Sequence, residues 1–306
     1  MRLGIYLALF ATLALSAALE PAARRLAPRA AAVVLTVGTI AAGLVWVGAL
    51  GLLALATVGR VRLVGSLGHW SVAVIEARDP VPLAAGLASL AVLLFVTAAL
   101  AESCRRLVRG LLQLGRLHLS TVGRRRGDVA VIDAATPEAL ALPGWRGSVV
   151  VTSGMLKALE PGERRVLLAH ERSHLRNRHW IFRLLTRLGA ALLPTARPLV
   201  ARCDQALERW ADEDAADVVG DRHLVATAVA RAALARSEHH RLALAQAFSD
   251  GAVAERVETL LAPRRPSRWT SASVPGGIAV IALFTMFEAV RDLEGLFEAA
   301  RRVWPG

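Results

Sequence analysis

A long stretch without any charged side chain, "AAAVVLTVGTIAAGLVWVGALGLLALATVG" (residues 30–59), decides the fold class of this chain. About 20 apolar residues are enough for a helix to cross the hydrocarbon core of a bilayer. Three similar segments lie at Leu3–Leu19, Pro80–Ala101 and Trp269–Phe287. Because 55% of all residues are also hydrophobic, the sequence predicts a mainly α-helical membrane protein with about four transmembrane helices.

The first and last of these segments carry weaker signals than the two between them. In the last, Pro275-Gly276-Gly277 is expected to interrupt the helix and Glu288 to end it. The first also fits a cleaved signal peptide, because Arg2 precedes its apolar run and small residues follow. We expect it to be retained, because two stronger spans follow it. Cleavage would instead leave the central part of the chain outside the cell.

The distribution of arginine predicts the orientation, because positive residues next to membrane spans stay in the cytoplasm. The two short loops between the first three spans do not favour either orientation, because each carries three arginines. A denser group follows the third span: Arg105, Arg106, Arg109, Arg116, Arg124, Arg125 and Arg126. The sequence therefore predicts a multi-pass plasma-membrane protein whose long central segment faces the cytoplasm, with both termini outside.

The net charge of +12 raises the question of nucleic-acid binding. The sequence shows no zinc finger and no RNA-binding signature, and its basic residues gather near membrane ends. Anionic lipid headgroups account for such clusters, so we expect the lipid bilayer as a partner and no direct nucleic-acid binding. Cys104 and Cys203 indicate neither a disulfide framework nor a zinc knuckle.

The change in composition along the chain predicts three parts: residues 1–103 with three spans, a cytoplasmic domain at 104–268, and residues 269–306 with the last span and a short tail. Residues 105–123 read as an amphipathic helix that continues out of the membrane. Two β-branched runs, 128–133 and 148–152, predict neighbouring strands joined by a Pro- and Gly-rich loop. Helices are expected at 159–180, with Pro161 in the first turn, and at 200–220 and 223–248; an interfacial or partly buried helix is expected at 181–198.

The stretch "HERSH" (170–174) is the first pattern with a chemical meaning. Residues four apart lie on one face of a helix, so His170 and His174 can aim ring nitrogens at one ion. Hydrolytic zinc sites use three protein ligands and keep a place for water, from which Glu171 would take a proton as general base. The pattern predicts one Zn²⁺ per chain; the alternative is a surface helix with His and Glu in solvent.

A third ligand must come from elsewhere in the chain. A third histidine six residues after His174 would stand at position 180, where this chain has Trp180, and His179 is one place off. The later "ERWAD" (208–212) offers Glu208 as a ligand, with Asp212 one turn on to accept a hydrogen bond from a ligand imidazole. The alternative is a solvated acidic face that continues through Glu213, Asp214 and Asp217.

Three segments together resemble a known family: residues 151–179, "ERWADEDAA" (208–216) and "ERVETLL" (255–261). They look like the membrane metallopeptidases of the BlaR/MecR type and, more distantly, the HtpX-like and CAAX prenyl protease group. The resemblance covers roughly residues 100–262 and implies a small α+β zincin-like protease domain. Carried over, it implies that His170, His174 and Glu208 bind zinc, that Glu171 is catalytic, and that Asp212 supports a ligand.

Two features depart from the resembling families. BlaR/MecR sensors carry an extracellular penicillin-binding domain after the last span, whereas only Arg291–Gly306 follow here, so direct β-lactam sensing by that route is not expected. The HtpX-like group often has a histidine shortly before the arginine that matches Arg256, and this chain has none there.

Transition-state stabilisation and substrate binding are assigned less directly. The candidates for stabilising the oxyanion are Arg256, His223, His239 and His240, with Arg256 favoured by the resemblance and a structural salt bridge as its alternative role. An extended peptide is expected to add to the edge of the strand at 148–152.

These features predict a membrane-anchored zinc endopeptidase. By resemblance, its substrate would be a cytoplasmic repressor or another regulatory protein. The alternatives are an HtpX-like protease for membrane-protein quality control, or a non-catalytic membrane signal transducer with a structural metal.

Overall fold

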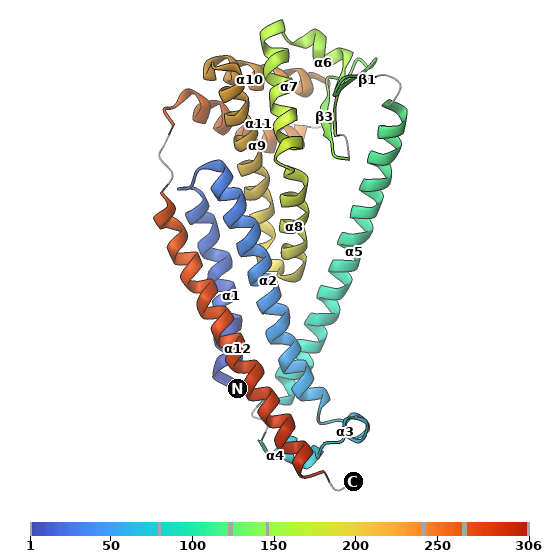
Figure 1. The fold of residues 1–306 in the computed structure, drawn as a ribbon, viewed down its shortest axis with the longest axis vertical. Coiled ribbons are helices and arrows are strands. Elements are labelled where there is room, and N and C mark those ends of the chain that lie inside the picture. The colour runs from blue at the N-terminus through green and yellow to red at the C-terminus, as the bar shows by residue number, and fades with distance from the viewer. Residues whose placement is uncertain are drawn as a thin grey trace.

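The computed structural model describes residues 2–78, 81–121, 125–144, 147–239, 243–264 and 268–304. Figure 1 shows an elongated, mainly helical molecule with a bundle of long helices in one half and a smaller α+β part at the other end. This arrangement agrees with the predicted fold class.

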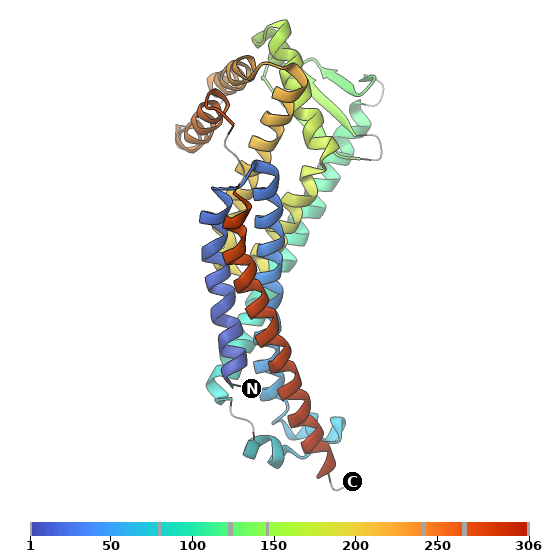
Figure 2. The same ribbon diagram turned by 60° about the vertical axis from the view of Figure 1, so that its left-hand side comes forward.

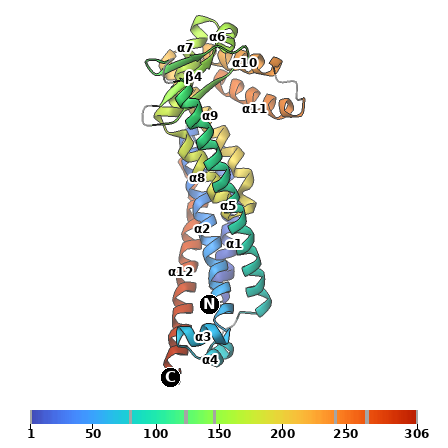
Figure 3. The same cartoon turned by 90° about the vertical axis from the view of Figure 1, so that its right-hand side faces the viewer.

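Four helices are long and apolar enough to cross a membrane, as the sequence predicted. They are α1 (Arg2–Ala23), α2 (Pro28–Val58), α5 (Leu83–Thr121) and α12 (Ser273–Arg302). Two short helices, α3 (Arg62–Gly68) and α4 (Val72–Arg78), lie between α2 and α5. As expected, α5 continues far beyond its apolar part, and Figure 3 shows it running along one side of the molecule to the sheet.

The expected interruption of the last span is wrong. Pro275 lies in the first turn of α12, where a missing N–H costs no helical hydrogen bond, and the helix passes through Gly276 and Gly277. It also continues past Glu288 to Arg302, because residues after Phe287 still alternate apolar and charged side chains at helical spacing.

The sheet contains β1 (Arg125–Arg126), β2 (Val129–Ile132), β3 (Ala139–Leu142) and β4 (Ser148–Thr152), in the order β1-β2-β4-β3. The two predicted strands are confirmed as β2 and β4, which pair in parallel. The sequence did not predict β3, which pairs antiparallel to β4 and occupies the sheet edge. The expectation that a peptide adds to the edge of β4 is therefore wrong, because β4 already has a partner on both sides.

Within the described residues, seven further helical segments make up the rest of the α+β part and its connection to the bundle. They are α6 (Ser153–Ala158), α7 (Pro161–Arg176), α8 (His179–Leu192), η2 (Pro194–Ala196), α9 (Arg197–Val219), α10 (Arg222–His239) and α11 (Ala243–Leu261). A short 3-10 turn, η3 (Trp269–Ala272), precedes α12. Helix α7 begins as predicted, with Pro161 in its first turn and a capping box between Glu160 and Glu163.

Helix α8 was expected at the interface or partly buried, and it packs directly on α2. At Gly189 an added Cβ would lie 2.9 Å from backbone atoms of Thr39 and Ile40, so the two helices are in backbone contact. Nearby, the buried hydroxyls of Thr36 and Thr186 share a hydrogen bond of 2.9 Å. Helices α1, α2 and α9 also share one apolar cluster. Helices α8 and α9 are thereby anchored in the bundle.

We predict that Gly189→Ala lowers stability by about 1–3 kcal/mol, because the added methyl group meets backbone that cannot rotate away. Gly110→Ala on α5 is the control: an added Cβ meets nothing within 4 Å there, so the better helix propensity of alanine should leave stability equal or higher. Thermal unfolding of the full chain in detergent measures both. Equal behaviour of the two variants would contradict close packing of α8 on α2.

Candidate metal centre

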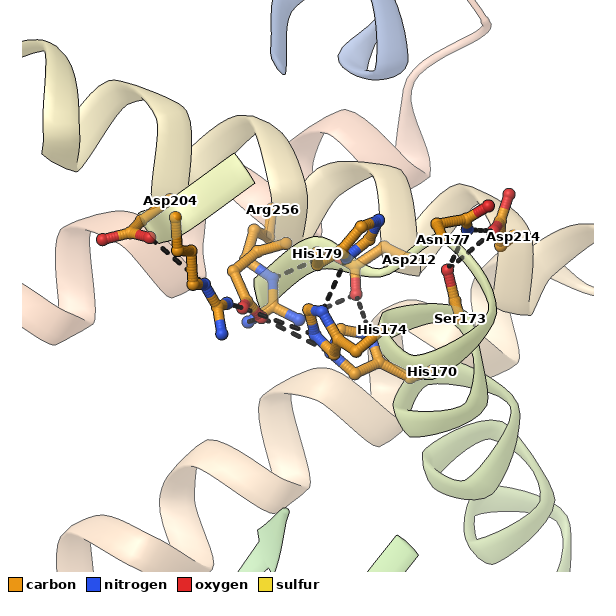
Figure 4. A network of polar contacts seen from close by, with 11 residues as sticks. His170, Ser173, His174, Asn177, His179, Asp204, Asp212, Asp214 and Arg256 are labelled. Carbon is orange, nitrogen blue, oxygen red and sulfur yellow. Dashed lines mark hydrogen bonds and ion pairs between the residues drawn. The ribbon is translucent and has the colours of Figure 1, made fainter. Parts of the chain in front are cut away.

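Helices α7 and α9 bring together the three side chains that the sequence singled out as metal ligands. The Nε2 atoms of His170 and His174 lie 3.2 Å apart. The Glu208 carboxylate places one oxygen 3.4 Å from Nε2 of His170 and the other 3.5 Å from Nε2 of His174. Figure 4 shows both imidazoles pointing away from α7 toward α9. Two imidazoles and one carboxylate thus converge on one point.

The spacing of these atoms fits a zinc ion. Tetrahedral zinc with bonds of about 2.0–2.1 Å needs ligand atoms about 3.3 Å apart. The three measured separations lie around that value. Two nitrogens and a carboxylate are also ligands that zinc favours, and three protein ligands are the number found in hydrolytic zinc sites. The group therefore fits zinc by distance and by chemistry.

The outer nitrogen of His170 is held by a buried carboxylate. Asp212 is 1% exposed, and its Oδ1 lies 3.0 Å from Nδ1 of His170. Arg256 of α11 donates two hydrogen bonds of 2.7 Å to the same carboxylate. Burial alone would raise the pKa of Asp212, but the bonds from Arg256 and His170 outweigh it and hold the pKa below its usual value. Asp212 therefore stays ionised and fixes the proton of His170 on Nδ1.

The outer nitrogen of His174 has a different partner, His179. Their Nδ1 atoms lie 2.7 Å apart, and His179 is fully buried against the Trp210 ring at a centroid distance of 4.7 Å. Burial, aided by the charge of Arg183, lowers the pKa of His179 to about 4, so this ring is neutral at pH 7 and its Nδ1 can accept a hydrogen bond from the Nδ1–H of His174. The sequence excluded His179 as a regularly spaced third ligand; the structure places it behind the second one.

Without a metal ion the two ligand imidazoles have opposite charge preferences. Burial opposes protonation of His170, but hydrogen bonds with Asp212 and Glu208 outweigh it and raise its pKa to about 10. Burial and the charge on His170 lower the pKa of His174 to about 3. Burial would raise the pKa of Glu208, yet its contacts with the histidines and Arg256 hold that pKa well below the usual value. The ligand carboxylate is thus ionised.

Glu171, the expected general base, lies between the imidazoles and the sheet. Its side chain is buried, and its carboxylate accepts a hydrogen bond from the backbone of Ala141 in β3. Burial raises the pKa of Glu171, while positive charges at His170 and Arg236 act in the opposite direction. The net pKa is raised, which brings this carboxylate closer to the range in which a group both takes and returns protons at neutral pH.

A pocket of about 220 Å³ opens beside these groups. One wall is the edge of β3, and the opposite wall is α10, with Ala228, Ala232 and Arg236 at successive turns. Three arginines line it. Arg183 contacts Asp204 and Glu208, and Arg256 contacts Asp212, whereas Arg236 has no carboxylate partner within the described part of the chain.

The candidates for oxyanion stabilisation are placed differently from one another. Arg256 lines the pocket, but Asp212 engages its guanidinium, so a structural ion pair accounts for it. His223 is exposed at the start of α10 and does not line the pocket. The side chains of His239 and His240 lie outside the residues that the structure describes.

The acidic residues after Asp212 form a separate set of contacts. Asp214 accepts hydrogen bonds from Ser173, Arg176 and Asn177 of α7 and the turn after it. Glu213 bonds instead to arginines outside α9. The Glu208 and Asp212 side chains face the imidazoles, so a uniformly solvated acidic face does not describe α9.

Comparison with known families supports a peptidase. Residues 121–261, which include every residue of the centre, match the model of peptidase family M48. Peptidases of this family are zinc-dependent, in agreement with the geometry of the ligand group. The match does not distinguish a BlaR/MecR-like from an HtpX-like subgroup. No curated protein and no solved structure matches the chain.

We predict that Arg256→Met lowers stability by about 3 kcal/mol, because it leaves the Asp212 carboxylate buried without its cation. Arg236→Met is the matched control, since this arginine lines the same pocket without a carboxylate partner in the described residues and its loss should change stability little. Chemical unfolding in detergent, followed by tryptophan fluorescence, measures both. An equal loss in the two variants would argue against the ion pair as a structural element.

Proposed function

We propose that this protein is a membrane-anchored zinc endopeptidase. The observation that carries the proposal is the convergence of His170, His174 and Glu208 at tetrahedral spacing, next to the buried carboxyl of Glu171. The match of residues 121–261 to peptidase family M48 supports the same reaction class.

In this proposal His170, His174 and Glu208 hold the ion, which when bound supplies a water of lowered pKa and a positive charge for the scissile carbonyl. Glu171 takes the proton of that water and returns it to the leaving amine; its raised pKa suits both steps. Asp212 and His179 contact the ligand imidazoles and not the ion itself. Each holds the outer nitrogen of one ligand imidazole and so keeps its Nε2 free for the ion.

The edge of β3 is the proposed binding strand for an extended peptide. The Ala141 N–H points off this edge to Glu171, and N–H groups alternate along a strand, so the Ala139 N–H faces the same free edge. A peptide added there as a further strand would run past Glu171 and the ligand imidazoles.

Arg236 is the proposed partner for negative charge on the substrate. It lines the pocket opposite β3 and acts electrostatically on Glu171, yet it has no carboxylate partner in the described residues. Its guanidinium can therefore stabilise the negative charge that develops on the carbonyl oxygen of the substrate in the transition state.

For the cellular setting, we propose a peptidase domain on the cytoplasmic face that cleaves a repressor or another regulatory protein. The motif resemblance supports this role, and the arginines after the third span support the orientation. An inactive variant that still binds substrate would trap a soluble regulatory protein under this proposal, and misfolded membrane proteins if the role were quality control.

We predict that Glu171→Gln keeps zinc but lowers peptide cleavage by about 10³-fold or more, because the amide cannot take a proton. Glu208→Ala should lose both zinc and cleavage, because one of three ligands is gone. Metal analysis of the purified full chain and a casein cleavage assay give the two readouts. Cleavage by Glu171→Gln at the wild-type rate would sink the proposed base, and full zinc content in Glu208→Ala would sink the proposed ligand set.

We predict that Ala139→Pro raises the KM for peptide substrates about fivefold, because one edge N–H is lost to the substrate. Leu140→Pro is the control on the neighbouring residue. Its N–H faces β4, so this variant should lower stability rather than act on KM alone. An unchanged KM in a folded Ala139→Pro enzyme would contradict binding at this edge.

We predict that Arg236→Met lowers kcat about 100-fold with a smaller change in KM, because the lost charge acts mainly on the transition state. Arg236→Lys should recover part of kcat, since it keeps the charge but not the planar geometry. A change confined to KM would instead assign Arg236 to ground-state binding.

A further inference from the structure

A second cavity, of about 1230 Å³, lies on another face of α9, away from the metal centre. The end of α1, the start of α2, one stripe of α9 and the end of α11 enclose it. Figure 2 shows α11 above the turn between α1 and α2, with the start of α12 beside them. None of the residues proposed for catalysis lines this cavity.

Many of the side chains that line the cavity are charged. Seven arginines line it: Arg24, Arg25, Arg202, Arg209, Arg222, Arg264 and Arg268. The acidic members are fewer: Glu20, Glu213, Asp217, Glu255 and Glu258. Several of these form ion pairs, such as Arg24 and Arg202 with Glu20, and Arg222 and Arg264 with Glu213. The lining therefore keeps an excess of positive charge.

Three of the seven arginines are the least neutralised by neighbouring acidic groups. The side chains of Arg25 and Arg268 make no hydrogen bond or ion pair within the described part of the chain, and a 3.2 Å bond from the Arg268 N–H to the Arg25 carbonyl holds the two residues together. Arg209 reaches Glu255 only at 4.0 Å, and its Nε is buried without a hydrogen-bond partner. A buried donor without an acceptor is costly, and an anion bound in this cavity would supply the acceptor.

The position of the cavity indicates what kind of anion fits. Three of the four membrane-length helices end at it: α1 at Ala23, α2 at Pro28 and the last span at Trp269. Its lining also has an apolar part, which includes the buried side chains of Leu26, Ala31 and Leu35. Arginines above an apolar floor at the end of membrane helices match a phosphate group with acyl chains below it.

We propose that this cavity binds a phosphate-bearing ligand, and that the ligand is the headgroup of an anionic phospholipid. Arg25 and Arg268 hold the phosphate oxygens, Arg209 adds a further donor, and the acyl chains lie along the apolar floor. The proposal is independent of the peptidase reaction.

The test uses the full chain in detergent, mixed with phosphatidylglycerol or phosphatidylcholine, and counts retained lipid by native mass spectrometry. Wild type should retain one phosphatidylglycerol in preference to phosphatidylcholine. The double variant Arg25→Ala, Arg268→Ala should bind phosphatidylglycerol about 10- to 30-fold more weakly, since two surface cations are lost. The matched control, Arg126→Ala with Arg165→Ala, removes the same charge from exposed positions outside the cavity and should bind as wild type.

Two further experiments test the role of charge and the source of the phosphate group. Arg25→Lys with Arg268→Lys keeps the charge and should retain most binding, and circular dichroism checks that each variant is folded. Titration with inorganic phosphate separates the two sources of the phosphate group: binding of phosphate without retained lipid would support the anion site but overturn the lipid headgroup. Equal retention of both lipids, or equal loss in the control variant, would overturn the proposal.

Discussion

One chain of charged hydrogen bonds, from Arg256 through Asp212 to His170, holds the centre of this molecule together. It joins α11, α9 and α7, three helices that are far apart in the sequence. Because Asp212 is almost fully buried, its charge is tolerated only while both partners are in place. The hydrogen bonds that orient the His170 imidazole therefore also fix the three helices relative to one another. The geometry of the metal ligands and the stability of the domain depend on the same contacts.

The sequence predicted the parts of the fold and the centre that depend on local spacing. Two histidines four apart, a carboxylate pair four apart and a long uncharged stretch each constrain one helix, and each is found where expected. The sequence also led us to expect a hydrogen bond from one ligand imidazole to Asp212, because a ligand imidazole needs an outer acceptor, and the structure shows that this imidazole is His170.

The missed features depend on contacts between distant segments. The letters "ALAL" of β3 contain no β-branched residue, so only its pairing with β4 reveals a strand. The sequence analysis tested His179 only as a metal ligand at a regular spacing and did not consider a contact with His174. The turn after α7 brings the two rings together. Arg236 follows two alanines at one-turn spacing, but nothing in that pattern shows which way the face of α10 points.

The length of α5 has a mechanical consequence. At about 1.5 Å per residue this helix is a rod of about 58 Å, and its far end packs Leu114 and Leu117 against the face of the sheet that includes Leu142 of β3. Because the helix has no break, a tilt of about 5° about the end far from the sheet displaces the end at the sheet by about 5 Å. In a bilayer, a change in lateral pressure or thickness that tilts α5 therefore moves the strand that borders the pocket.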